Sequence, residues 1–119
     1  MKDWREVLIK KDVTIHEAIN KIDSASLQIA LVVDEENKLL GTVTDGDIRR
    51  GILRGLLYDE PVSKVMNHTP VTGRINISRK EVLDLMRINQ VTRVPILNDN
   101  MQVAGIENLD DLLLKPKEK

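Results

Sequence analysis

Thr44 and Asp47 stand three residues apart, where an apolar stretch gives way to a helical one in the segment "GTVTDGDI". A hydroxyl followed three residues later by a carboxylate is the capping box that starts many helices. The start of a helix also attracts phosphate, because its first amides are unpaired and the helix dipole is positive there. A carboxylate at this point suits neutral hydroxyl groups of a ligand rather than phosphate. The two interpretations, a helix cap and a ligand site, are compatible, and both stay open.

Three arginines, Arg49, Arg50 and Arg54, follow this pair on the predicted helix. On an amphipathic helix such charges form a solvated face, whereas beside a phosphate group they bind it. Successive helical residues point about 100° apart. We therefore expect at most one of Arg49 and Arg50 to face a ligand.

Residues for other chemistries are missing or unsuitably spaced. The two histidines, His16 and His68, stand in different local contexts, and the chain has no cysteine, which argues against a metal site and excludes thiolate chemistry. The stretch "DGD" lacks the remaining ligands and the closing glutamate of a calcium loop. The sequence contains no glycine-rich phosphate loop, and no serine has an evident His/Asp partner. We therefore predict that the chain is not an enzyme and requires no cofactor or metal.

The 119 residues suffice for one compact domain or for two small lobes that share a core. Hydrophobic residues make up 41% of the chain and Phe is absent, so the core must be built from Val, Ile, Leu and Met. The net charge of -1 gives no electrostatic footprint for nucleic acid. No apolar run approaches the roughly 18 residues of a membrane span, and the N-terminus lacks a signal peptide. We expect a cytoplasmic protein without nucleic-acid partners or membrane insertion.

The chain repeats itself with a constant offset of 64 residues, so that residues 13–48 match residues 77–112 without a gap. Both copies begin with a capping box, "TIHE" or "SRKE", followed by a helix with a one-sided apolar stripe. Each then has an apolar strand, a polar turn and a second strand that contains Gly41 or Gly105. A further helix start, "TDGD" or "NLDD", closes each copy. Each copy is predicted to fold as helix, strand, turn, strand, helix.

Such a unit cannot bury both faces of its strands alone, so we expect the copies to pack sheet to sheet around a pseudo-twofold axis. The predicted fold class is α/β, in the α+β sense, with two helix-strand-strand-helix repeats. We place the first repeat at residues 1–60 and the second at residues 61–114, with an inter-repeat linker at its start. In this linker "VSKVM" is long enough for one short helical turn. Residues 115–119 carry no apolar side chain and are predicted to be a solvated tail.

Together these segments resemble the CBS domain, a repeat of about 60 residues that occurs in tandem pairs called Bateman modules. The resemblance covers nearly the whole chain, from Val7 to Leu114, and is most specific at "GTVTDGDI", which is similar to the family's G-h-[ST]-x-x-D signature. It implies a cytoplasmic regulatory module that binds adenine nucleotides, or sometimes S-adenosylmethionine, in clefts between the repeats. It also implies a place within a larger protein and pairing into a disc-like homodimer.

The resemblance assigns roles to the residues that match the family's motif. It implies that the Thr44 hydroxyl contacts phosphate and that the Asp47 carboxylate accepts hydrogen bonds from ribose hydroxyls. It further implies backbone contacts to the base from Thr69, Pro70 and Val71, and a basic group near phosphate from Arg93.

The second copy of the signature departs from this pattern. Asn108 replaces the hydroxyl residue and Glu107 precedes it, although Asp111 remains. Asn108 and Asp111 are still able to cap a helix, but a carboxylate beside phosphate repels the ligand. We expect one good ligand site, at Thr44 and Asp47, and one poor site, at Asp111.

Two functions remain open on this basis. The first is a regulatory module that senses AMP, ADP or ATP, with S-adenosylmethionine less favoured, and modulates a tethered partner domain. The alternative is a structural dimerisation or scaffold module without nucleotide, with an apolar pairing surface formed by Ile48, Ile52, Leu53, Leu112 and Leu113. For both we expect a homodimer and a covalently linked catalytic or transport domain C-terminal to Lys119. The expected parent is a sugar-phosphate nucleotidyltransferase-like protein.

Overall fold

The computed structural model describes residues 3–25 and 27–114, so the predicted tail at residues 115–119 lies outside the described residues. The chain divides into two compact units, Met1–Pro70 and Val71–Lys119. None of the helices in the part of the chain that the structure describes combines the length and the apolar composition of a membrane span.

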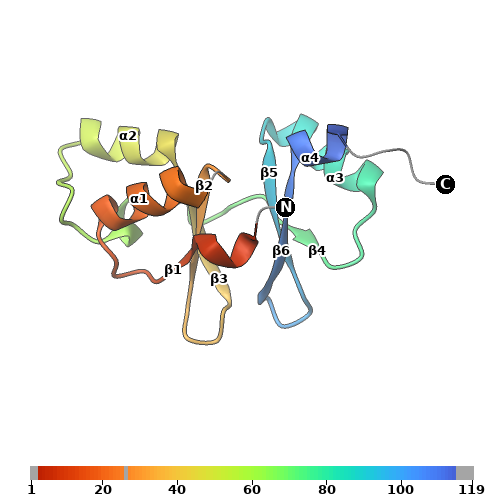
Figure 1. Ribbon diagram of the computed structural model, residues 1–119, viewed down its shortest axis with the longest axis horizontal. Coiled ribbons are helices and arrows are strands. Elements are labelled where there is room, and N and C mark those ends of the chain that lie inside the picture. The colour runs from red at the N-terminus through yellow and green to blue at the C-terminus, as the bar shows by residue number, and fades with distance from the viewer. Residues whose placement is uncertain (1–2, 26, 115–119) are drawn as a thin grey trace. The chain divides into compact units, whose positions relative to one another are not determined.

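The first unit is a three-stranded sheet with two α-helices (Figure 1). Its elements in chain order are the 3-10 helix η1 (Trp4–Val7), β1 (Leu8–Ile9), α1 (Ile15–Ala25), β2 (Ile29–Val33), β3 (Leu39–Thr44), α2 (Asp45–Leu53) and the 3-10 helix η2 (Val62–Lys64). The central strand β2 pairs with β1 in parallel and with β3 in antiparallel. Because α2 begins at the residue after β3 ends, the edge strand leads directly into the signature residues.

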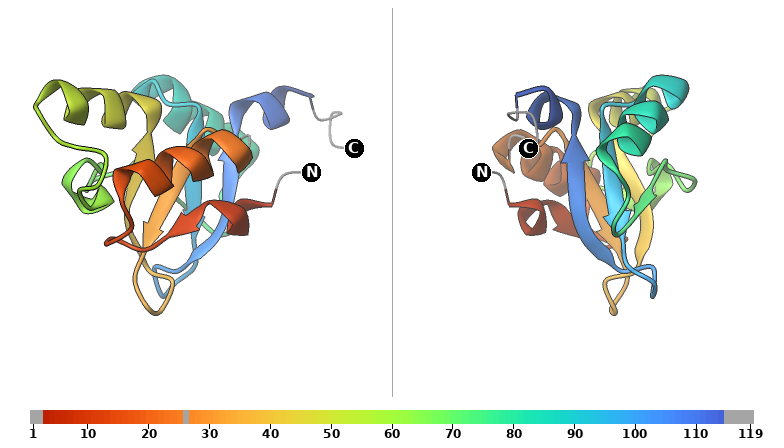
Figure 2. Two further views of the ribbon diagram at one scale, coloured as in Figure 1. Left: turned by 60° about the vertical axis from the view of Figure 1, so that its left-hand side comes forward. Right: turned by 90° about the vertical axis from the view of Figure 1, so that its right-hand side faces the viewer.

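The second unit repeats this topology (Figure 2). Its elements are β4 (Gly73–Arg74), α3 (Arg79–Asn89), β5 (Arg93–Leu97), β6 (Val103–Asn108) and α4 (Leu109–Leu114). The central strand β5 pairs with β4 in parallel and with β6 in antiparallel. The last helix, α4, corresponds to α2 of the first unit.

Strand pairing confirms the internal repeat. Ile29 faces Thr44 across β2 and β3, and Arg93 faces Asn108 across β5 and β6, 64 positions further along the chain. Both hairpins also carry a register irregularity at the corresponding step near the end of the central strand. The predicted α+β fold of two related repeats is therefore confirmed.

Capping boxes start α1 and α3 as predicted. At α1 the Glu17 amide donates to the Thr14 hydroxyl and the Thr14 amide donates to the Glu17 carboxylate, both at 3.1 Å. Ser78 and Glu81 make the same reciprocal pair at α3. These contacts satisfy amides that a helix leaves unpaired at its start.

The core of the first unit lies between its sheet and the helices α1 and α2. Ile15 of α1 and Val32 of β2 are fully buried in one apolar cluster, to which Ile48 of α2 also belongs. Val62 and Val65, from the segment after α2, complete the same cluster. Burying one such side chain contributes roughly 1.5–3 kcal/mol. The predicted helical turn in "VSKVM" is confirmed as η2, and it is part of this core.

Backbone hydrogen bonds hold the segment after α2 to the first unit at two places. The Ile15 amide donates to the Glu60 carbonyl oxygen at 2.9 Å, beside the start of α1. Thr42 of β3 and Asn67 exchange two hydrogen bonds, of 3.1 and 2.8 Å. Residues 61–67, which we placed as a linker at the start of the second repeat, thus contact the first unit.

The second unit has an apolar cluster of its own. Its buried members come from both helices and from the central strand, and they are Val82, Met86, Val94, Ile96 and Leu112. None of the buried residues of the first cluster belongs to it. Each unit thus has an apolar cluster of buried aliphatic side chains, and that of the second unit also includes a methionine.

The sequence analysis missed η1, β1 and β4. The two strands are only two residues long, which is too short for an alternating apolar pattern to stand out. They become strands because each pairs with an adjacent buried strand, β2 or β5.

Candidate functional site

Thr44 and Asp47 hold each other at the start of α2 by three hydrogen bonds. Asp47 Oδ2 accepts from the Thr44 amide at 2.9 Å and from the Thr44 hydroxyl at 3.1 Å, and the Asp47 amide donates to Thr44 Oγ1 at 3.3 Å. The predicted capping box is therefore confirmed. The Asp47 side chain is only 15% exposed, so its carboxylate is fixed and partly buried where β3 ends.

Arg50 is the arginine that the structure brings to this pair. Its Nη2 donates to Asp47 Oδ1 at 2.8 Å. Arg49 is exposed, and Arg54 is the C-cap at the other end of the helix. One of the two adjacent arginines thus contacts the signature, as helix geometry predicted, but the sequence did not indicate which one.

Gly41 lies on β3 where the chain from residue 66 onward passes close to the strand. A Cβ at Gly41 would lie 2.6 Å from the Asn67 carbonyl oxygen and 2.9 Å from the Met66 sulfur. Only glycine permits this approach without a backbone shift. The glycine of the signature therefore lets Asn67 pair with Thr42, and this pairing fixes the chain just before Thr69.

The segment expected to contact the base spans the boundary between the two units. Thr69 is exposed, and its amide donates to the Asn67 side-chain oxygen at 3.0 Å. Pro70 is the last residue of the first unit, and Val71 opens the second unit and packs against its core. Thr69 and Pro70 therefore share a unit with the start of α2, whereas Val71 does not.

Arg93 belongs to the second unit, where it begins the central strand β5. It faces Asn108 across the β5–β6 hairpin, and its Nη1 donates to the Thr92 hydroxyl oxygen at 2.7 Å. Its side chain is partly buried. This arginine thus lies at the start of α4, the helix that corresponds to α2.

The start of α4 is built differently from the start of α2. The Asp110 amide donates to Asn108 Oδ1 at 3.2 Å, so Asn108 caps the helix. Its Nδ2 is buried without a hydrogen-bond partner among the described residues. Asp111 is exposed, and its side chain makes no hydrogen bond within residues 3–25 and 27–114. The predicted cap is confirmed for Asn108 and wrong for Asp111, because Asn108 bonds the second amide of the helix rather than the third.

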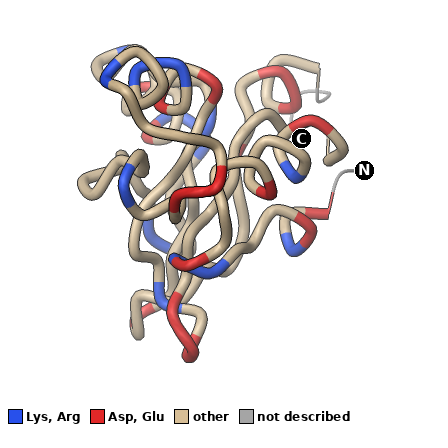
Figure 3. Tube along the Cα trace, turned by 90° about the vertical axis from the view of Figure 1, so that its left-hand side faces the viewer, with Lys and Arg blue, Asp and Glu red and all other residues tan. Residues whose placement is uncertain are grey.

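Charged residues of both signs are interspersed along both units (Figure 3). The backbone amide of Lys38 lowers the pKa of Asp34 in the β2–β3 turn, and the hydrogen bond from Lys80 lowers the pKa of Asp84 on α3. Among the described residues, no three His, Cys, Asp or Glu side chains are placed to hold a metal ion.

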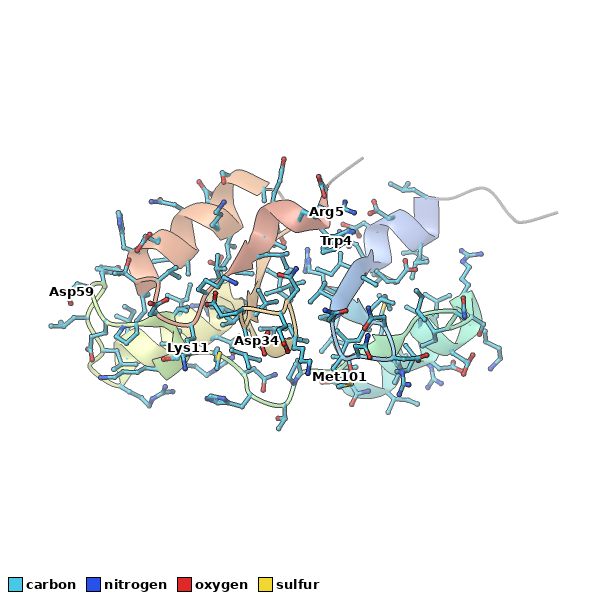
Figure 4. All side chains as sticks on the ribbon, turned by 90° about the horizontal axis from the view of Figure 1, so that it is seen from below. Trp4, Arg5, Lys11, Asp34, Asp59 and Met101 are labelled. Atoms are coloured by element: carbon cyan, nitrogen blue, oxygen red, sulfur yellow. The ribbon has the colours of Figure 1, made fainter. Side chains whose placement is uncertain are left out.

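Trp4, the only tryptophan, lies on η1 next to Arg5, whose guanidinium is 4.5 Å from the centre of the ring (Figure 4). The 3-10 helix packs against α1 and β2. Packing of the N-terminal segment is thus the role that these contacts support for Trp4.

The model of the CBS domain family matches residues 3–54 and residues 62–117. The protein YlbB of Bacillus subtilis (strain 168), which is described as uncharacterized, is 35% identical over 105 residues, covering 84% of this chain and 68% of that protein. The inosine-5'-monophosphate dehydrogenase of Methanocaldococcus jannaschii is 33% identical over 113 residues, covering 93% of this chain and 22% of the enzyme. The chain spans about a third or less of the length of the first curated relatives it matches.

Solved structures share the fold. An uncharacterized conserved protein from Pyrococcus horikoshii superposes with a TM-score of 0.82 at 27% identity, covering 95% of this chain and 88% of that one. A CBS domain protein from Pyrobaculum aerophilum, complexed with AMP, also gives 0.82, at 19% identity, covering 97% and 92%. A CBS domain pair in complex with methylthioadenosine and S-adenosyl-L-methionine gives 0.80 at 21% identity, covering 90% and 84%. At their low identity, the likeness to the last two structures concerns the fold alone.

Proposed function

Because the chain belongs to the CBS domain family, with two copies of the domain, we propose that it is a regulatory module that binds an adenine nucleotide, AMP, ADP or ATP. The observation that carries the proposal is the start of α2. There three hydrogen bonds join Thr44, which carries the hydroxyl, to Asp47, which carries the partly buried carboxylate. An ion pair joins Asp47 to Arg50. S-adenosylmethionine is the less favoured ligand, since it brings no phosphate for the arginine and the helix start.

Each part of the nucleotide has a proposed partner. Phosphate binds at the Thr44 hydroxyl and the α2 start, since amides and dipole favour an anion there. The ribose hydroxyls donate to Asp47, a carboxylate that is already held in place by the capping box. The base is bound by backbone groups of Thr69, Pro70 and Val71. We propose Arg93 as a further phosphate contact and Asp111 as the ribose partner of a weaker second site.

Structural relatives support this assignment by their ligands. The Pyrobaculum aerophilum protein is complexed with AMP, and the cytosolic domain of the Mg2+ channel MgtE is complexed with ATP. Another CBS pair is complexed with S-adenosyl-L-methionine. All three ligands carry adenosine, which is the chemical feature that the proposed ribose and base contacts recognise.

Regulation would follow from differential affinity. A nucleotide that binds one conformation of the module more tightly than another shifts the conformational equilibrium of a linked domain. The size of this shift is limited by the difference in binding free energy between the two conformations. In the dehydrogenase, for example, the match to this chain covers only 22% of the length. The rest of that protein is long enough for a further domain. We propose a cytoplasmic homodimer with a catalytic or transport domain linked C-terminally; the nucleotidyltransferase-like parent stays a prediction from the sequence.

A scaffold without nucleotide is the second candidate, and exposed leucines favour it. Leu53 on α2 and Leu113 on α4 are 79% and 64% exposed. The predicted pairing surface is smaller than expected, however, because Ile48 and Leu112 are buried in the two cores. Light scattering of the chain and of its Leu53→Asp variant would test this pairing. A dimer that does not respond to nucleotides would favour the scaffold.

Thermal shift with AMP, ADP, ATP and S-adenosylmethionine at millimolar concentration tests the proposed function. A ligand present at 100 times its Kd adds about 2.7 kcal/mol to the free energy of unfolding. Asp47→Ala should abolish the shift with AMP. Asp111→Ala, at the matched position of the second repeat, should leave most of it. If none of the four compounds shifts the melting temperature, the proposal fails; an undiminished shift in Asp47→Ala would move the site elsewhere.

A further inference from the structure

We propose that Arg50 selects a phosphate-bearing ligand over the unphosphorylated nucleoside at the start of α2. The inference rests on the proposed function and goes further, because it names the residue that discriminates between these two ligand classes. The helix carries three arginines, Arg49, Arg50 and Arg54, and only Arg50 contacts the signature.

The Arg50 guanidinium extends back over the first turn of its own helix. Its Nη2 lies 2.8 Å from Asp47 Oδ1, and its Nη1 lies 3.2 Å from the position that a Cβ on Gly46 would take. Helical side chains lean toward the N-terminus, so an arginine three residues on reaches the start of the helix. The absence of a side chain at Gly46 leaves the room for this approach.

The charges at this helix start depend on Arg50. Asp45 and Asp47 place two carboxylates in the first turn of α2, where they would repel a phosphate group. The ion pair with Arg50 compensates the charge of Asp47. Without the guanidinium, the same turn would offer a phosphate two negative charges in place of one.

Donor capacity remains for a ligand. A guanidinium has five N–H groups, and within the described part of the chain the only hydrogen bond of the Arg50 guanidinium is the one to Asp47. Its side chain is 65% exposed, so solvent and ligands reach it. Such a planar group binds a phosphate through two parallel hydrogen bonds.

Asp47 is left with capacity for the sugar. A carboxylate accepts about four hydrogen bonds, and Asp47 receives three, two from Thr44 and one from Arg50. The remaining lone pair is on Oδ1, the oxygen that Arg50 contacts. Ribose and phosphate would thus meet adjacent atoms of one ion pair.

The second repeat lacks this arrangement. The position that corresponds to Arg50 is Leu114, whose side chain is 82% exposed, and the position that corresponds to Gly46 is Asp110. The second helix therefore carries no arginine in the place of Arg50; the nearby Arg93 comes from β5, and its Nη1 donates to the Thr92 hydroxyl oxygen. Phosphate selectivity should be confined to the first repeat.

Calorimetric titration of the 119-residue chain with adenosine and with AMP tests the inference, using the wild type, Arg50→Gln and the adjacent control Arg49→Gln. Arg50→Gln should weaken AMP binding at least about tenfold, the range of one charge-assisted hydrogen bond, and change adenosine binding less than about twofold. Arg49→Gln should change both less than about twofold. Arg50→Lys, which keeps the charge and loses the planar fork, should fall between the wild type and Arg50→Gln for AMP. Melting curves will check that each variant folds.

Equal losses for adenosine and AMP in Arg50→Gln would overturn the inference, because Arg50 would then only position Asp47. Unchanged AMP binding in that variant would also overturn it, while leaving the proposed function intact. If the wild type binds neither compound, the proposed function fails and the role of Arg50 fails with it. A smaller salt dependence of AMP binding in Arg50→Gln than in Arg49→Gln is the supporting result.

Discussion

The two units share strand order, pairing register and hairpin irregularities, yet they differ where the last strand meets the last helix. In the first unit a capping box and an ion pair surround the start of α2. In the second unit the side chain of Asn108 caps the start of α4, without a capping box or an ion pair among the described residues. The fold thus tolerates either start, since both satisfy some of the amides at the helix end. The first unit has, in addition, the positioned carboxylate of Asp47 and the guanidinium of Arg50 on the same helix. The second unit folds without this pair.

A similar contrast separates the two signature glycines. Gly41 lies under the chain that follows η2, whereas a Cβ at Gly105 would meet no described atom within 4 Å. The same residue at the same step of the repeat is therefore a packing requirement in one unit only. The reason is the segment after α2, from which Met66 and Asn67 approach Gly41.

The largest effect should come from alanine at these glycines. Gly41→Ala would drive a methyl group into the Asn67 carbonyl oxygen, and such overpacking costs about 1–3 kcal/mol. Gly105→Ala should be neutral or stabilise the chain by about 0.4–1 kcal/mol, because it only restricts the unfolded state. Urea unfolding of both variants measures the difference. Equal free energies of unfolding would refute the idea that the close approach distinguishes the units.

The two matched aspartates should differ next. Asp47→Ala removes the acceptor of the capping box and of Arg50, and the loss of a cap costs about 0.5–2 kcal/mol. Asp111→Ala removes no hydrogen bond and should change the free energy of unfolding by no more than about 0.5 kcal/mol. Thermal unfolding without ligand compares them. A larger cost for Asp111→Ala would mean that the two helix starts are more alike than the contacts indicate.

The hairpin turns offer a reciprocal pair of exchanges. Asn37 and Met101 occupy the same left-handed position, with φ of 66° and 65°. Asn tolerates this conformation better than Met, because its short polar side chain bonds locally. Met101→Asn should stabilise the chain by about 0.5–1 kcal/mol, and Asn37→Met should destabilise it by a similar amount. Melting temperatures that move in the same direction for both exchanges would contradict this account.

The smallest expected effect is a pH dependence confined to one turn. Asp34 accepts from the amides of Glu36 and Lys38 at 2.8 and 3.0 Å, and the Lys38 amide in particular lowers its pKa. Asn98 makes the same two contacts in the second turn but does not titrate. Because the folded-state pKa of Asp34 is lowered, its contribution is complete above the ordinary aspartate pKa of about 4. It is lost as the pH falls through the folded-state value.

Asp34→Asn should therefore flatten the decline of stability below about pH 4, and Asn98→Asp should steepen it. Melting temperatures measured between about pH 2 and pH 7 for the two exchanges test the sign. If the fall of the melting temperature at acid pH is unchanged in both variants, these turns do not contribute to the loss of stability there. The remaining acid sensitivity includes Asp84 and Glu60, whose pKa values are also lowered.

Local signals explain why much of the fold was predictable. Capping boxes at Thr14, Thr44 and Ser78 and apolar strands around polar turns are signals within a few neighbouring residues, and the constant offset of 64 residues shows that these signals occur twice. They point to the same elements, and such agreement between levels is what specifies a fold. The same locality explains the failure at β1 and β4, whose two residues carry no period of their own.

The sequence by itself determined the two α+β repeats, the helix starts and the pair of side chains, Thr44 and Asp47, that the proposed ligand contacts, because spacing along the chain fixes these features. Only the tertiary structure decided that Arg50 rather than Arg49 joins this pair and that Gly41 is needed for the approach of Asn67. Both depend on which side chain or segment passes through a given point in space. Residue types and spacing permit several such contacts, and only the packing of the folded chain determines which of them forms.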